Sequence, residues 1–137
     1  MHDKPLRDAM TTDPTTVEPG TSLKEAAQLM KSDDVGALPV VENGRLTGMI
    51  TDRDIAIRAV AEGKLESAVG EIASKDVVSI DPQQSLEEAA RLMAQHQIRR
   101  LPVCEEDGRL VGIIAQADVA QIGHDELTGE VVQRISQ

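Results

Sequence analysis

Apolar residues recur along this chain with a helical period that appears twice. In residues 23–30 they fall at i, i+3, i+4 and i+7, the spacing of a helix with one apolar face, and residues 86–93 repeat it. Ser22 and Ser85 stand one residue before these stretches, and each is followed three residues later by glutamate, the spacing of a capping box. The pattern predicts two equivalent helices whose apolar faces pack into a core.

Two short apolar runs follow each predicted helix. Residues 37–41 and 45–50 flank Asn43-Gly44, and residues 101–104 and 109–114 flank Asp107-Gly108. Asn-Gly and Asp-Gly are strong hairpin signals. A β-branched run precedes each helix, at 15–17 and 77–80, and a second helix is predicted from about Asp52 and Gln116. Each copy therefore reads β-α-β-β-α, a three-stranded sheet covered on one side by two helices.

The chain is thus a tandem repeat with an α/β (α+β) fold. We predict one domain at residues 8–62, a second at 70–122 and a helical tail at 123–137. A unit of roughly 60 residues buries too little surface to be comfortably stable alone. The copies are therefore expected to pack through their sheets with pseudo-two-fold symmetry. The apolar spacing of the tail fits docking on its own domain or on a second subunit about equally well.

The composition limits the kinds of partner that the chain is expected to bind. With 24 acidic and 14 basic residues the net charge is -10, which repels nucleic acid and anionic membrane surfaces. No stretch has the roughly 20 apolar residues needed to span a bilayer, and the N-terminus has no apolar signal region, so we expect a cytoplasmic protein. Phe, Trp and Tyr are absent. A ligand site here cannot use aromatic stacking.

Metal and catalytic chemistry are not expected. His2, His96 and His124 lie far apart, without cysteine or carboxylate at ligand spacing. The single cysteine, Cys104, excludes an internal disulfide and reads as a small buried hydrophobe in an apolar strand. There is no P-loop and no nucleophile motif.

The segment GMITDRDI, residues 48–55, places a hydroxyl, a guanidinium and a carboxylate at a strand-to-helix junction. The simplest interpretation is a helix start, with Thr51 as N-cap and Asp54 at N3. The second copy, GIIAQADV, has Ala115 at the cap position and keeps Asp118. A capping box without its cap loses half its purpose, so the recurring aspartate suggests a role outside the helix. An ionised carboxylate only accepts hydrogen bonds, and it pairs well with a vicinal diol.

These motifs resemble those of a pair of cystathionine-β-synthase-type (CBS) domains, or Bateman module. The matching stretches are ALPVV and RLPVC, GRLTGMITDRDI and GRLVGIIAQADV, and SLKEAAQLM and SLEEAARLM, within about residues 8–122. The resemblance implies a non-catalytic module that binds AMP, ADP or ATP, and sometimes NAD or S-adenosylmethionine, in two clefts between the paired domains. No cofactor is required. Such proteins usually form homodimers of four CBS domains and signal to an effector, which the sequence does not identify.

The resemblance also implies roles for particular residues. Asp54 and Asp118 would each bind the ribose hydroxyls in one cleft, and Thr51 and Arg53 would contact ribose or phosphate. Arg100 matches a phosphate-binding arginine of the family, although the Arg99-Arg100 pair fits solvated residues at a strand edge equally well. The remaining expected contacts are Val35, Gly36 and Ala37, opposite Ile98 and Arg99.

Two functional hypotheses follow. The first is an adenine-nucleotide sensor of energy or stress state, in which ligand binding changes how the domains or subunits are arranged. The second is a scaffold or protein-interaction module whose clefts are empty or vestigial. Ala115 favours the second hypothesis for one cleft, and Thr51, Arg53 and Asp54 together favour the first for the other.

Overall fold

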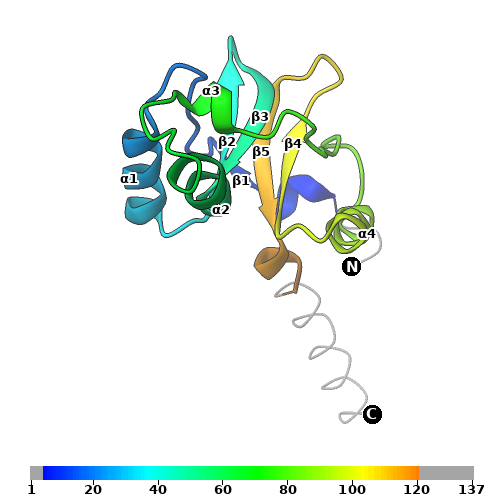
Figure 1. Ribbon diagram of the computed structural model, residues 1–137. Helices are drawn as coiled ribbons and strands as arrows, with labels where there is room; N and C mark the ends of the chain where they lie inside the picture. Colours follow the sequence, from blue (N-terminus) through cyan, green and yellow to red (C-terminus); the bar gives the residue numbers. More distant parts are fainter. Residues whose placement is uncertain (1–4, 121–137) are drawn as a thin grey trace, which may run out of the picture. The chain divides into compact units, whose positions relative to one another are not determined.

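A computed structural model describes residues 5–120, which form two compact units (Figure 1). The first-repeat unit contains Pro14–Val77 and Glu106–Leu110. The second-repeat unit contains Val78–Glu105 with the described residues before Pro14 and after Leu110. The domain limits 8–62 and 70–122 stay a prediction about the repeats along the chain, and the tail predicted at 123–137 lies outside the described residues.

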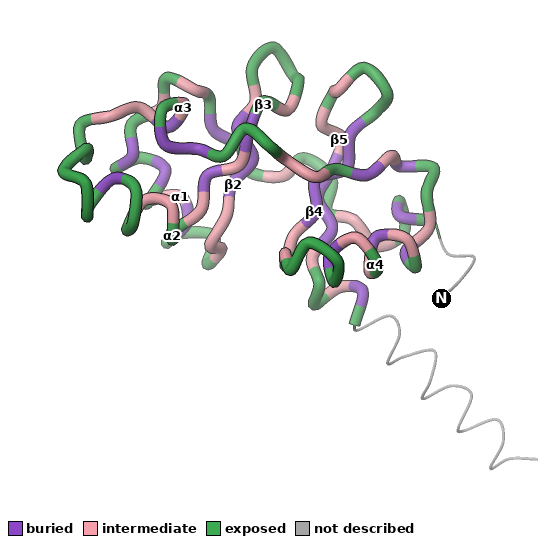
Figure 2. The backbone as a smooth tube through the Cα atoms, turned by 45° about the vertical axis from the view of Figure 1, so that its right-hand side comes forward, coloured by how far each residue is buried: buried purple, intermediate pink, exposed green. Residues whose placement is uncertain are grey.

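The first-repeat unit is an antiparallel β-ribbon with helices on one side (Figures 1 and 2). The ribbon runs from the pair Ala37 and Thr51 to the pair Glu42 and Arg45, with a bulge after Val40. The elements are α1 (Leu23–Asp33), β2 (Ala37–Glu42), β3 (Arg45–Thr51), α2 (Asp52–Asp54), the π-helical η2 (Ile55–Val60) and α3 (Val69–Ile72).

The second-repeat unit contains a three-stranded sheet in the order β1-β5-β4. Its strand β1 pairs antiparallel with β5, and a helical stretch begins at residue 116, as the sequence predicts. The elements are η1 (Leu6–Asp8), β1 (Thr11–Thr12), α4 (Leu86–His96), β4 (Arg100–Cys104) and β5 (Leu110–Ala115). The mixed α/β class and the repeat are therefore confirmed.

The predicted helix starts form as expected. The Ser22 hydroxyl accepts a hydrogen bond from the Glu25 N–H at 3.1 Å, and Ser85 accepts one from Glu88 at 3.1 Å. Because each hydroxyl satisfies a backbone donor that has no partner within the helix, both helices begin immediately after their serines. The hairpin prediction is also confirmed, with Gly44 and Gly108 at φ of 81° and 90°.

The first predicted strand of each copy shrinks to one residue. Val17 forms a parallel bridge with Val40, and Ile80 forms one with Val103. Extending a parallel ladder at either end of these bridges needs an N–H from a position that is proline. These positions are Pro19 and Pro39 in the first copy, and Pro82 and Pro102 in the second. Since proline has no N–H, each ladder stops after a single bridge.

The segments that precede the two repeats are exchanged. In the second-repeat unit, Thr11 and Thr12 of β1 pair with Ile113 and Gly112 of β5. In the first-repeat unit, Ser74 bridges Met49 of β3, with both N–O distances at 2.9 Å. Residues 5–13 thus complete the second repeat and residues 68–77 complete the first. We call these the exchanged segments, and the repeat pattern did not predict the exchange.

Each unit has its own aliphatic core (Figure 2). The exchanged segments contribute fully buried side chains to both, Leu6 in one case and Val69 in the other. The first core consists of Val17, Leu23, Ala26, Met30, Leu38, Val40, Ile50, Ala59, Val69, Ile72 and Ala73. The second consists of Leu6, Ile80, Leu86, Ala89, Met93, Leu101, Val103, Ile114 and Val119.

The exchange depends on glycines that leave room for the incoming backbone. A Cβ on Gly48 would lie 2.7 Å from the Ser74 carbonyl oxygen, and one on Gly112 would lie 2.8 Å from the Thr11 carbonyl oxygen. We predict that Gly48→Ala and Gly112→Ala each lower the free energy of unfolding by about 1–3 kcal/mol, because backbone must move. Gly20→Ala is the control, since its Cβ meets nothing within 4 Å. Urea denaturation measures the effect, and equal midpoints for the three variants would contradict the prediction.

Candidate functional site

The first corner comprises residues 35–37, where α1 leads into β2, and residues 51–54, where β3 leads into α2. Ala37 pairs with Thr51, and the Gly36 carbonyl accepts a hydrogen bond from the Asp52 N–H at 2.9 Å. The six site residues predicted here, Val35, Gly36, Ala37, Thr51, Arg53 and Asp54, therefore lie in one place.

A full capping box organises the first corner. The Thr51 hydroxyl accepts from the Asp54 N–H at 3.0 Å, and Asp54 Oδ2 accepts from the Thr51 N–H at 3.2 Å. Asp54 is half-buried, and its other oxygen, Oδ1, has no hydrogen-bond partner among the described residues. One carboxylate oxygen is fixed by the fold, and the other can still accept a hydrogen bond.

The second corner, residues 98–100 and 115–118, repeats this geometry in the second-repeat unit. The Arg99 carbonyl accepts from the Gln116 N–H at 2.7 Å, and Asp118 Oδ2 accepts from the Ala115 N–H at 3.4 Å. Asp118 therefore keeps half of a capping box without a hydroxyl at the cap. The helix start thus explains part of why the aspartate recurs. In both corners the second carboxylate oxygen of the aspartate, Oδ1, has no hydrogen-bond partner within residues 5–120.

Three arginines give the corners unpaired positive charge. Arg53 and Arg99 are exposed and Arg100 is half-buried, and none makes a side-chain hydrogen bond or ion pair with a residue that the structure describes. A guanidinium in this state can bind phosphate through two parallel N–H donors. That Ile98 and Arg99 lie opposite residues 35–37 stays a prediction.

Asp52 is a corner residue that the sequence reasoning missed. Its Oδ1 accepts from the Arg53 N–H at 2.8 Å, and its Oδ2 lies 3.1 Å from where a Cβ of Gly36 would be. The side chain therefore covers the glycine. In the second copy the equivalent positions are Gln116 and Arg99. The available signal in the sequence was that Gly36 and Asp52 align with Arg99 and Gln116. These differences make the first corner the more acidic of the two.

The exchanged segments run beside the strands that end in the corners. Ser74 bonds to Met49, two residues before Thr51, and Thr11 pairs with Ile113, two residues before Ala115. The family resemblance implies that backbone groups near residues 10–15 or 73–78 recognise the adenine, which stays a prediction.

Cys104 is not part of either corner. Its thiol is buried, and burial raises its pKa, while a hydrogen bond with Ser79 acts weakly in the opposite direction. The thiol therefore stays protonated near neutral pH and is a poor nucleophile. Among residues 5–120, no three His, Cys, Asp or Glu side chains come close enough together to hold a metal ion.

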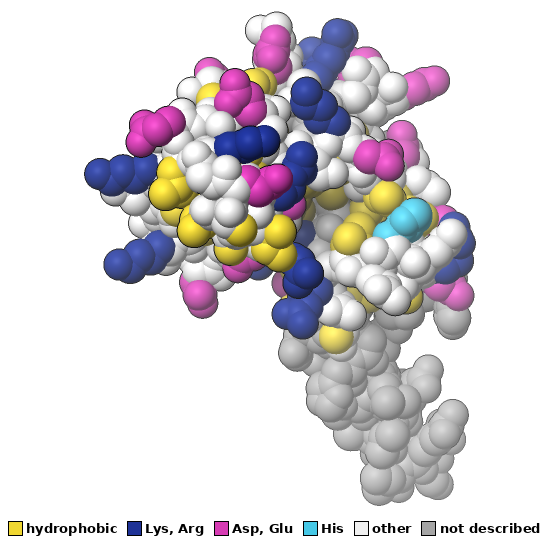
Figure 3. Space-filling model, in the orientation of Figure 1, with side chains coloured by type: hydrophobic (Ala, Val, Ile, Leu, Met, Phe, Trp, Pro, Cys, Tyr) yellow, Lys and Arg dark blue, Asp and Glu magenta, His cyan; other side chains and the backbone are white. Residues whose placement is uncertain are grey.

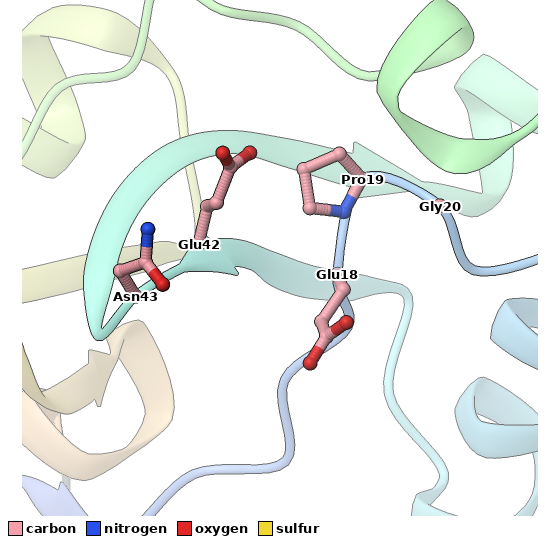
Figure 4. Close-up of a pocket in the computed structure, with 5 residues that line it drawn as sticks. All are labelled: Glu18, Pro19, Gly20, Glu42 and Asn43. Carbon is pink, nitrogen blue, oxygen red and sulfur yellow. The ribbon is translucent and has the colours of Figure 1, made fainter.

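A hollow of about 260 Å³ lies elsewhere in the first-repeat unit (Figure 4). Glu18, Pro19, Gly20, Glu42 and Asn43 line it, and none of these is a predicted site residue. The Glu42 side chain points toward Pro19, whereas Glu18 points away, so the two carboxylates do not converge. With two acidic groups in its wall, the hollow does not suit a phosphate-bearing ligand.

Comparison with known proteins identifies the family. The CBS domain model matches residues 6–60 and 69–125. The chain belongs to the CBS-domain family. This CBS pair is 53% identical over 116 residues to CBS domain-containing protein YhcV of Bacillus subtilis, a match that covers 84% of the chain and 82% of that protein. It is 42% identical over 118 residues to hypoxic response protein 1 of Mycobacterium tuberculosis, with the same two coverages.

Enzymes match the CBS pair over only a small part of their length. Inosine-5'-monophosphate dehydrogenase of Korarchaeum cryptofilum is 36% identical over 107 residues, which are 78% of this chain and 22% of the enzyme. The shared part is the size of the CBS pair, so the likeness concerns a module that such an enzyme carries.

Solved structures of CBS pairs share the fold. Hypoxic response protein I with two coordinated zinc ions has a TM-score of 0.78 and 40% identity, covering 86% of this chain and 98% of that one. CBSX2 in complex with AMP has a TM-score of 0.78 and 28% identity, and the match covers 88% of this chain and 96% of that one. The CBS pair of protein MJ0100 with 5'-methylthioadenosine and S-adenosyl-L-methionine has a TM-score of 0.80 and 27% identity, and the match covers 90% of this chain and 98% of that one.

The difference between the two caps gives a stability prediction. Thr51→Ala removes the hydroxyl that accepts from Asp54, and should lower the free energy of unfolding by about 0.5–2 kcal/mol. Ala115→Thr restores a hydroxyl opposite the Asp118 N–H, and should raise it by up to about 1 kcal/mol. Thermal and urea unfolding of both variants measure the changes. Loss of stability in Ala115→Thr would show that the second corner has no room for the cap.

Proposed function

We propose that this CBS pair is a regulatory protein that binds an adenosine-containing ligand at its strand-to-helix corners. The observation that carries the proposal is that the two carboxylate oxygens of Asp54 differ. Oδ2 accepts a hydrogen bond from the Thr51 N–H, whereas Oδ1 has no partner within the described residues. A ribose diol presents two O–H donors, and a fixed, ionised acceptor is the group that such a diol needs. Asp118 offers the same acceptor in the second corner.

Related structures support the ligand class. CBSX2 was crystallised with AMP, and the MJ0100 CBS pair with 5'-methylthioadenosine and S-adenosyl-L-methionine. All three ligands carry adenosine, and they differ in what is attached to its ribose. In this chain the unpaired guanidinium groups of Arg53, Arg99 and Arg100 favour a phosphate at that position. AMP, ADP and ATP are therefore preferred over S-adenosylmethionine, and NAD is compatible.

The proposed mechanism is regulatory and not catalytic. A ligand shifts a conformational equilibrium only by binding one state more tightly than the other. The corners join helices to strands, so closing Oδ1 and a guanidinium around one ligand would favour one position of α2 over another. An effector protein would read that change. The thiol of Cys104 is buried and protonated, which leaves the described residues without an activated thiolate.

We further propose that the chain forms a homodimer in the cytoplasm. Ile57, Val60 and Leu65 are 49%, 55% and 56% exposed, which is unusual for large apolar side chains on one short stretch. Hydrophobic side chains gather beside α2 in Figure 3. The stretch includes η2, where the Ala61 N–H bonds to the Ala56 carbonyl at 3.1 Å in the wider π-helical pattern.

No helix in residues 5–120 is long and apolar enough to cross a membrane.

The ligand proposal is tested with Asp54→Asn. The asparagine amide oxygen can still accept from the Thr51 N–H, so the cap and the stability should persist within about 0.5 kcal/mol. The charge is lost and one acceptor oxygen becomes a donor. AMP affinity, measured by isothermal titration calorimetry, should therefore fall by at least about tenfold.

Asp33→Asn is the matched control, because it makes the same change on an exposed residue at the end of α1. Its AMP affinity should equal that of the unmodified protein. If AMP, ATP and S-adenosylmethionine all fail to bind the unmodified protein, the scaffold hypothesis replaces the sensor hypothesis. If Asp54→Asn binds AMP as tightly as the unmodified protein does, the carboxylate serves the helix start alone.

The dimer proposal is tested with Val60→Glu. Burying a carboxylate without a partner is costly, so the charge should weaken a dimer formed through this stretch by at least about tenfold. Sedimentation equilibrium should show a dimer for the unmodified protein and a monomer for the variant at the same concentration. Ala94→Glu, at an exposed position of α4, is the control and should stay dimeric. A monomeric unmodified protein would overturn the proposal.

A further inference from the structure

The turns of the two repeats meet in a short antiparallel ribbon. Arg45 bridges Arg109, with the Leu46 N–H bonded to the Gly108 carbonyl at 3.0 Å and the Leu110 N–H bonded to the Gly44 carbonyl at 3.0 Å. The tripeptide Gly-Arg-Leu of the first repeat thus pairs with the same tripeptide of the second. The local arrangement is two-fold symmetric, and residues 106–110 belong to the first-repeat unit together with residues 44–46.

This pairing brings two guanidinium groups together. The hydrogen bonds flank the bridge, so Arg45 and Arg109 form a non-hydrogen-bonded pair, in which the Cα atoms are about 4.5 Å apart and the side chains leave the same face. Like charges directly opposite each other destabilise a ribbon. Both side chains are exposed, and neither makes a hydrogen bond or ion pair with any residue from 5 to 120.

Two nearby carboxylates, those of Asp107 and Glu42, make no ion pair with these guanidinium groups. Asp107 Oδ1 accepts from the Arg109 backbone N–H at 3.1 Å, so this carboxylate stabilises the turn. Glu42 is opposite Arg45 in the β2–β3 register, yet its side chain points toward Pro19, in the wall of the hollow (Figure 4). The chain carries a net charge of -10 and still leaves two arginines side by side without an acidic partner among residues 5–120.

We propose that Arg45 and Arg109 bind a small phosphate-class anion, inorganic phosphate or diphosphate, between their guanidinium groups. Each guanidinium offers a planar fork of N–H donors that matches two oxygens of such an anion, and two forks related by a local two-fold suit a symmetric anion. The bound anion replaces the repulsion across the bridge with attraction on both sides. It therefore strengthens the junction between the turns.

The site is separate from the ligand corners. Arg45 begins β3 and Thr51 ends it, so about 20 Å of strand lies between them. A mononucleotide bound in the first corner cannot reach the arginine pair. The anion at this site is therefore a free one, and it would act on the junction independently of the adenosine ligand.

The test is isothermal titration calorimetry of the full chain with phosphate and with pyrophosphate. The unmodified protein should show saturable binding, and Arg45→Gln/Arg109→Gln should lose at least about tenfold in affinity. Arg45→Lys/Arg109→Lys keeps the charge and loses the planar forks of donors, so its affinity should lie between those of the unmodified protein and the Gln double variant. Lys24→Gln/Lys31→Gln changes the net charge equally on exposed positions of α1 and should bind like the unmodified protein.

Two further readouts separate this site from the corners. Thermal unfolding in phosphate-free buffer should show the Gln double variant at least as stable as the unmodified protein, because the repulsion is gone, and phosphate should stabilise only the unmodified protein. AMP affinity should be the same in both. Equal phosphate affinity in the two proteins overturns the proposal. So does competition between phosphate and AMP, since the anion would then occupy a ligand corner.

Discussion

The exchange of the segments that precede the two repeats is the constraint on which the rest of the structure depends. The backbone of Ser74 bonds twice to Met49 in β3, and β1 pairs with β5 in the same relation. Each hairpin thus gains its neighbouring segment, β1 in one unit and the bridge at Ser74 in the other, from a part of the chain that the sequence repeat assigns elsewhere. A single repeat cut at its sequence limits would lose that segment, and one of them would also lose the fully buried Leu6. Stability and the surroundings of each corner therefore come from the whole chain.

The exchange also explains how glycine and proline are used. Gly48 and Gly112 stand where a side chain would strike the incoming backbone, so the strands accept the cost of glycine to permit close approach. Prolines at the bridges of Val17 and Ile80 act in the opposite sense, because they end the parallel ladders on both sides. The sheets are consequently narrow, and helices cover one side of the first ribbon.

Local chemistry was readable from the sequence, and long-range pairing was not. The serine caps, the Asn-Gly and Asp-Gly turns and the amphipathic helices depend on residues a few positions apart, and they form as predicted. The corners could be assembled as well, because each needs only a hairpin of known register. The exchanged segments are different. Residues 5–13 carry too few apolar positions to show a period, and their partner strand lies about a hundred residues away. Asp52 was missed because its role depends on the space above Gly36.

The capping function and the proposed ligand function of the corner aspartates support each other. A carboxylate that is free to rotate loses entropy when it binds a diol, whereas one already fixed through Oδ2 presents Oδ1 in a set direction. Thr51 and Asp54 fix each other through two bonds, of 3.0 and 3.2 Å, while Asp118 has one bond of 3.4 Å. The first corner is therefore better organised for ribose, and the second, with Arg99 and Arg100, has more positive charge for phosphate. Under the proposed function, the two repeats would favour different parts of the same class of ligand, because organisation is stronger in one corner and charge in the other.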